Sequence, residues 1–208
     1  MLLCLSGAGL TGLNLAGLVI PPAEHSRTHT AKTLKLTLEF TPPENTIAAL
    51  EALPAPLTAA TLREATRIVA AGIVHYWPDT DAFDPETIYS PLENWVIYIA
   101  SIAETLAWEA GLPLRPRFSV LERFDYRAAI RKGVGFCSQV SLALADYLEE
   151  RGTPSRVVGL DGHVVVETSV GGQHYLLDPD YDVIMPLSLD EAARNLSAVE
   201  KYYLDRGY

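Results

Sequence analysis

The stretch that decides the fold is Gly135-Phe-Cys-Ser-Gln-Val-Ser-Leu-Ala-Leu-Ala-Asp-Tyr-Leu148. Its apolar residues recur every three or four positions, which is the spacing of one face of an α-helix. They are Val140, Ala143, Leu144, Tyr147 and Leu148. Gly152 follows them, as is typical of a helix end. The pattern therefore predicts a packed helix whose first turn contains Cys137.

The sequence changes its period after this helix. The segments 156–160, 163–169 and 173–177 are rich in β-branched residues or alternate apolar with polar residues, as strands do. Asp161-Gly162 and Gly171-Gly172 separate them, and both are typical hairpin-turn dipeptides. The pattern predicts an antiparallel meander directly after the helix.

Further helices are predicted on both sides of this region. Thr58 and Thr61 are alternative caps for a helix whose apolar residues again follow helical spacing. The segments 92–110, 125–132 and 188–203 have helical patterns as well. Because helices come first and strands follow, the predicted class is α+β, with a helical N-terminal half and a small antiparallel β-sheet.

The composition limits the classes of function. The chain has 208 residues, of which 49% are hydrophobic and 20% charged, as in an ordinary globular domain. Its net charge of -10 argues against nucleic-acid binding, because that affinity comes largely from Lys and Arg that neutralise phosphates. Cys4 and Cys137 are the two cysteines, so neither a disulfide framework nor a thiolate zinc site is expected. No metal site and no cofactor is predicted.

The first residues differ from the rest of the chain. Residues 2–20 carry no charge and end at Pro21-Pro22, so residues 1–22 form an apolar leader of nearly bilayer-spanning length. A membrane anchor and a signal peptide are the two main interpretations, and a buried helix is a third. Either main interpretation predicts a membrane-associated or exported protein, without assigning the side of the membrane. Residues 23–57 then supply a strand, at 32–40, and a linker, and residues 58–208 form the main domain.

Three residues of this domain together suggest nucleophilic chemistry. Cys137 occupies the predicted first turn of a helix, where unpaired backbone N–H groups and the macrodipole favour a thiolate. His163 begins a strand just after a tight turn, and Asp178 ends the next strand. Adjacent antiparallel strands can bring the imidazole and the carboxylate together, so that the carboxylate orients the base. The sequence predicts a Cys–His–Asp acyl-transfer site.

The sequence around these residues resembles the transglutaminase-like superfamily. The resemblance rests on the cysteine motif quoted above, on Arg151-Gly-Thr-Pro-Ser-Arg-Val-Val-Gly159, on Gly162-His-Val-Val-Val-Glu167 and on Tyr175-Leu-Leu-Asp-Pro179. It covers about a third of the chain, roughly residues 125–186. It implies a papain-related catalytic domain over residues 58–208, in which the nucleophile-bearing helix packs on the sheet.

The same resemblance implies a mechanism. Cys137 would be the nucleophile, His163 the general base and acid, and Asp178 the carboxylate that orients the histidine. The expected reaction is acyl transfer on an amide bond of a peptide or protein through a thioester acyl-enzyme, by hydrolysis rather than transamidation on the family's base rate. Two alternatives remain open: an inactive transglutaminase-like domain used for binding or scaffolding, and an acyltransferase that takes its acyl group from a thioester donor such as coenzyme A.

Other residues are candidates for the surroundings of the site. The backbone N–H of Cys137 is a candidate oxyanion-hole donor, and Gln139, Trp95 or Tyr126 could supply a second. Gly135 would allow the backbone to approach a substrate closely. His75 and His174 have no assignable partners, and Glu167 is expected to be a structural hydrogen-bonding partner rather than a second catalytic acid. The departure from the family is local: Val164, Val165 and Val166 stand where many members carry an aromatic residue.

Overall fold

The computed structural model describes residues 40–75 and 122–208, with residues 9, 11, 12, 99, 100, 102, 103, 106, 107 and 110–112. The strand predicted at 32–40 lies outside these residues except for Phe40, as do most of the leader and most of the helix predicted at 92–110. Within the described ranges, no helix combines the length and the apolar composition needed to cross a bilayer.

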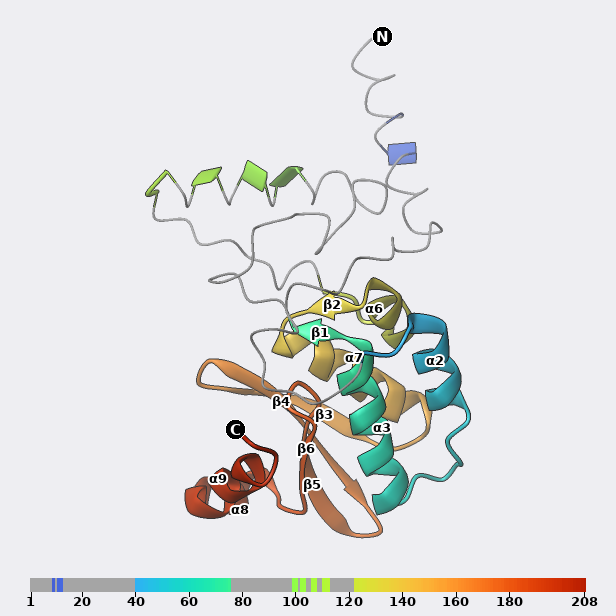
Figure 1. Cartoon of the computed structure of the whole chain (residues 1–208), viewed down its shortest axis with the longest axis vertical. Coiled ribbons are helices and arrows are strands. Elements are labelled where there is room, and N and C mark those ends of the chain that lie inside the picture. The colour runs from blue at the N-terminus through green and yellow to red at the C-terminus, as the bar shows by residue number, and fades with distance from the viewer. Residues whose placement is uncertain are drawn as a thin grey trace.

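A four-stranded antiparallel sheet forms the centre of the described fold (Figure 1). Its strands lie in chain order: β3 (Ser155–Leu160), β4 (His163–Val170), β5 (Gln173–Asp178) and β6 (Val183–Met185). The first three strands confirm the predicted meander to within one residue at each end. The short strand β6 was not predicted, because its three buried residues are too few to show a period.

Four helices within residues 40–75 and 122–150 precede the sheet. They are α2 (Pro43–Glu51), α3 (Ala59–Gly72), α6 (Tyr126–Lys132) and α7 (Cys137–Glu150). Thr58 caps α3 and forms a reciprocal capping box with Thr61, so the two candidate caps act together. The helix predicted to begin at Cys137 is confirmed, and its predicted apolar face is fully buried.

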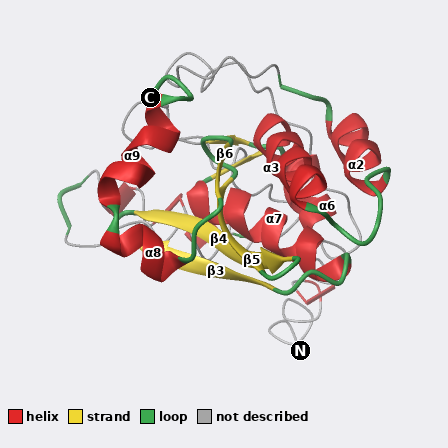
Figure 2. Cartoon of the chain, turned by 90° about the horizontal axis from the view of Figure 1, so that it is seen from below, coloured by secondary structure: helices red, strands yellow, loops and turns green. Residues whose placement is uncertain are grey.

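The two faces of the sheet pack against different helices (Figure 2). Val166 and Leu177 belong to the larger core, which they share with residues of α3, α6 and α7. Their neighbours Val165 and Leu176 belong to a second core with residues of β6 and the C-terminal helices. This alternation follows from the two-residue period of a strand. The predicted class, helices with a small antiparallel sheet, is confirmed.

The C-terminal helix predicted at 188–203 is in fact two helices. They are α8 (Leu189–Arg194) and α9 (Leu196–Leu204), and Asn195 lies between them with φ −137° and ψ 67°. The Asn195 side chain accepts a hydrogen bond from the backbone N–H of Ala198 and so caps α9. The prediction of one continuous helix was wrong because the asparagine side chain competes locally with the helical hydrogen bonds.

A two-stranded parallel ribbon leads into α7. Strand β1 (Val74–His75) pairs with β2 (Val134–Gly135), so that His75 lies opposite Gly135. A Cβ atom added at Gly135 would lie 2.6 Å from Cβ and Cγ of Gln139. Gly135 therefore permits a close approach between β2 and the first turn of α7. The ribbon places His75 beside the segment that leads directly to Cys137.

Candidate active site

Helix α7 begins at Cys137, and its N-terminus has no polar side-chain cap. The preceding residue is Phe136, whose side chain offers no oxygen to the first backbone N–H groups of the helix. By contrast, oxygen-bearing side chains cap α3, α6, α8 and α9. Cys137 is half-buried and its thiol is free. The side chain of Cys137 therefore lies beside the positive end of the helix dipole.

The structure brings His163 and Asp178 to this cysteine. The His163 Nε2 atom lies 2.7 Å from the Asp178 Oδ2 atom, and the imidazole also interacts with the Cys137 side chain. Because Nε2 interacts with the carboxylate, Nδ1 is the ring nitrogen available to interact with the sulfur. The Ser141 hydroxyl donates to the Val164 carbonyl at 2.8 Å, which fixes the start of β4 against α7.

The surroundings of His163 favour its protonated form. Burial alone would lower the pKa of His163, because it removes water from the charged imidazolium. Hydrogen bonds and Coulomb attraction to Asp178 and Cys137 oppose this effect and raise the pKa to about 10. The imidazole is 23% exposed, and the Asp178 carboxylate is fully buried. This arrangement is suited to a thiolate–imidazolium pair at neutral pH.

The buried carboxylate of Asp178 accepts four hydrogen bonds. Its Oδ2 atom accepts from His163 and from the Tyr203 hydroxyl, the latter at 2.6 Å. Its Oδ1 atom accepts from the backbone N–H groups of Asp180 and Tyr181, at 3.1 and 3.3 Å. A carboxylate with donors on both oxygens stays in one orientation, so the imidazole that it binds is also oriented.

Aromatic residues from the C-terminal segment surround this carboxylate. The Tyr181 ring meets the rings of His163 and Tyr208 edge-on, with centroids 5.4 and 4.8 Å apart. Burial, together with the Asp178 charge, raises the pKa of Tyr203, which therefore remains a neutral hydroxyl donor. Sequence reasoning missed Tyr203, because it lies 25 residues after Asp178 on a helix with no local motif.

The remaining predicted site residues have different positions. The Gln139 amide is buried. It accepts a hydrogen bond from the backbone N–H of Arg123 at 2.7 Å and donates one to the Arg123 carbonyl at 2.8 Å. Tyr126 is in the core against Tyr147, ten residues beyond Cys137 along α7, so the structure does not bring it to the cysteine. Trp95 lies outside the described residues. The position of Tyr126 in the core does not support the oxyanion role predicted for it, whereas the oxyanion roles of Gln139 and Trp95 stay predictions.

A carboxylate that the sequence did not single out lies beside the first turn of α7. The hydroxyl of Ser138, the residue after Cys137, donates to the side chain of Glu122. Burial raises the pKa of Glu122, and this hydrogen bond partly offsets the effect. The contact connects the segment before α6 to the first turn of α7.

A second histidine–aspartate pair lies next to the first. The His75 Nδ1 atom lies 2.8 and 2.7 Å from the two carboxylate oxygens of Asp180, and both side chains are almost completely buried. This pair could not be recognised from the sequence, because its members are 105 residues apart. No group of three or more histidine, cysteine or acidic residues in the described ranges is arranged to bind a metal ion.

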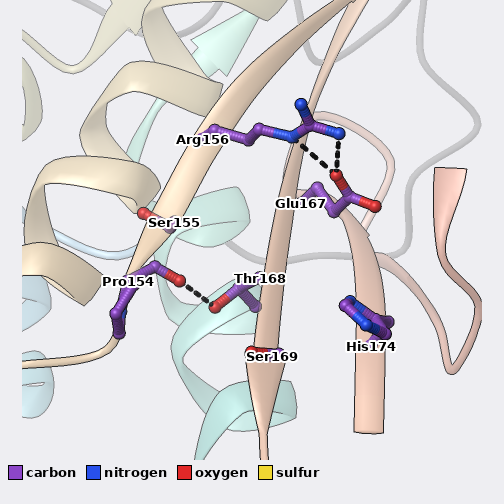
Figure 3. A pocket seen from close by; sticks show the side chains of 7 residues that line it. All are labelled: Pro154, Ser155, Arg156, Glu167, Thr168, Ser169 and His174. Atoms are coloured by element: carbon purple, nitrogen blue, oxygen red, sulfur yellow. Dashed lines mark hydrogen bonds and ion pairs between the residues drawn. The ribbon is translucent and has the colours of Figure 1, made fainter.

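A separate hollow of about 240 Å³ is lined by residues of β3, β4 and β5 (Figure 3). It is lined by Arg156, Glu167 and His174 among others, and by none of the three residues of the cysteine site. Glu167 accepts hydrogen bonds from the Arg156 side chain at 2.6 Å and from the Leu189 backbone N–H at 2.9 Å. The predicted structural role of Glu167 is thus confirmed, since it ties β3 and β4 to α8.

No family model, no curated protein and no solved structure matches this chain. The function is therefore inferred from the residues of the site and from their geometry.

Proposed function

We propose that this chain is a cysteine-dependent acyl-transfer enzyme with a transglutaminase-like, papain-related fold. The observation that carries the proposal is the position of the His163 imidazole, which interacts with both the buried Asp178 carboxylate and the Cys137 side chain. The location of Cys137 at the start of α7 supports it further, because a helix N-terminus stabilises a thiolate. The sequence resemblance in three separate motifs points to the same chemistry.

The proposed reaction has two halves. The Cys137 thiolate attacks the carbonyl carbon of an amide, and His163 donates its proton to the departing amine, which leaves a thioester on the sulfur. His163 then accepts a proton from water as the water attacks the thioester, and the acid is released with the thiolate restored. The backbone N–H of Cys137 is the proposed donor to the oxyanion of each tetrahedral intermediate.

The proposed substrate is an amide of a peptide or protein, and water is the proposed acceptor. A primary amine in place of water would give transamidation by the same thioester. The acceptor can be determined from the partition of a single acyl-enzyme between water and an added amine.

Acyl-enzyme formation tests this proposal directly. The full chain carrying Cys4→Ser would be mixed with p-nitrophenyl acetate, and the release of nitrophenolate and the mass of the protein would be followed. We expect a burst of about one equivalent and an added acetyl group on Cys137, with turnover in water. Cys137→Ala should abolish the burst, and His163→Ala should slow it by roughly 10²-fold or more, the scale of a lost general base.

Two other outcomes would favour the alternative functions. Acetylation of Cys137 at an equal rate in the His163→Ala variant would describe an ordinary thiol, and the chain would then be a binding or scaffolding domain. Acetylation from acetyl-coenzyme A at a higher rate than from simple esters would instead favour the acyltransferase alternative.

A further inference from the structure

The buried His75–Asp180 pair connects the two parts of the chain that carry the cysteine site. His75 lies on β1 opposite Gly135, two residues before Cys137, and its ring meets the Phe136 ring edge-on at 6.4 Å. Asp180 lies two residues after Asp178, and its backbone N–H donates to the Asp178 Oδ1 atom. The pair thus joins the segment that precedes the nucleophile to the turn that orients the carboxylate.

This contact has a geometry that fixes position. The His75 Nδ1 atom lies within 2.8 Å of both Asp180 oxygens, so a shift of either segment along the contact would break at least one of the two interactions. The two side chains are only 7% and 3% exposed, so water cannot readily replace the lost partner. The Cys137–His163–Asp178 chain is a second link between these segments at the site.

A contribution to stability does not explain why such a pair is buried. Removing a charged carboxylate from water is costly, and apolar residues of similar volume often stabilise a core equally well. A buried polar pair does, however, specify one arrangement of the segments that it joins. In this chain the specified arrangement is the distance between the start of α7 and the end of β5.

We propose that His75 and Asp180 are positioning residues that keep Asp178 and His163 in register with Cys137. This inference rests on the proposed acyl-transfer function, because it assigns the pair a role in the geometry of that site. The pair acts through the Asp180 backbone N–H on Asp178, and through Phe136 and Gly135 on Cys137. Neither member is proposed to contact the reacting atoms.

The test compares the pH dependence of Cys137 alkylation by iodoacetamide in variants of the full chain, all carrying Cys4→Ser. His75→Ala removes the contact, and His75→Asn retains a donor close to the Nδ1 position. Tyr147→Phe is the matched control, because it removes a buried hydrogen bond to the Leu50 carbonyl, 2.9 Å long, away from the site. Thermal unfolding of each variant separates loss of stability from loss of register.

We expect His75→Ala to slow alkylation at neutral pH by about 10- to 100-fold, the scale of an ångström-level displacement, and to move the profile toward an ordinary thiol near pH ~8.5. His75→Asn should recover most of the original profile. Tyr147→Phe should lower the unfolding temperature and leave the profile unchanged. A role in stability alone would move the unfolding temperature of all three variants without moving any pH profile.

An unchanged profile in a folded His75→Ala variant overturns the inference. If that variant does not fold, Asp180→Asn, which keeps the shape and removes the charge, takes its place with the same expectation. Failure of His75→Asn to restore the profile would also count against positioning through the Nδ1 donor. The proposed function itself fails separately, when His163→Ala leaves the profile of the parent chain unchanged.

Discussion

At the scale of single residues, Asp178 determines how the site is organised. Its carboxylate is fully buried, and both of its oxygens accept hydrogen bonds. The donors come from β4, from the turn after β5 and from α9. His163, oriented by this carboxylate, interacts in turn with Cys137. The least local of these contacts is the one from Tyr203, which makes the C-terminal helix part of the site.

Replacing Tyr203 with Phe tests this contact. The change removes the hydroxyl that donates to Asp178 Oδ2 and should lower the free energy of unfolding by about 2 kcal/mol, as expected for a hydrogen bond to a charged group. Urea denaturation at pH 7 measures the loss. Tyr202→Phe on the same helix is the control and should change little. Equal stability of the two variants would show that the Tyr203 hydroxyl does not support the carboxylate.

The three residues of the cysteine site could be predicted because each lies at the end of an element with a clear pattern. Cys137 starts an amphipathic helix, His163 follows an Asp-Gly turn, and Asp178 precedes a proline. His75 and Tyr203 could not be predicted in the same way. Their partners lie 105 and 25 residues away, and only tertiary packing brings them together.

At the scale of elements, the junction of β2 and α7 sets the position of Cys137. Strand β2 pairs with β1, one residue follows, and the helix begins. The first turn of α7 then packs so close to Gly135 that the structure has no space for a side chain there. The pattern of residues along the chain predicted the helix but not the parallel ribbon, because two-residue strands carry no measurable period.

Gly135→Ala should disturb this junction. The added methyl would lie 2.6 Å from the Gln139 side chain, so the first turn of α7 must shift, at a cost of about 1–3 kcal/mol for overpacking. We expect lower stability in urea and slower alkylation of Cys137. Gly159→Ala on β3 is the control, because its methyl would meet no atom within 4 Å. Unchanged alkylation in a folded Gly135→Ala variant would contradict the importance of the close approach.

At the scale of the whole molecule, the described sheet lies between two cores, and elements from both cores contribute residues to the cysteine site. Helix α7 packs on one face with Cys137 at its start, while α8 and α9 belong to the core on the other face. The alternation of strand residues predicted the antiparallel meander, but not that helices would cover both of its faces. The break at Asn195 and the contact between α9 and Asp178 could not be predicted from this alternation, because a single asparagine determines where one helix ends and the next begins.

The stability of the molecule should depend on pH through His163. Its pKa in the folded protein is about 10, above the ordinary value of 6.5, so its protonation stabilises the fold. This contribution is fully present below pH 6.5 and is lost as the pH rises through about 10. Urea denaturation at pH 6, 8 and 10 should therefore show that the free energy of unfolding falls more with rising pH in the parent chain than in His163→Gln. Parallel losses in the two proteins would contradict the raised pKa.

We propose that Cys137 and His163 work as a nucleophile and its base, and the pH dependence of Cys137 alkylation in the chain carrying Cys4→Ser tests this pairing directly. We expect Cys137 to react rapidly with iodoacetamide at neutral pH, and His163→Ala to confine the rapid reaction to alkaline pH. The same pH profile in both proteins would contradict the pairing.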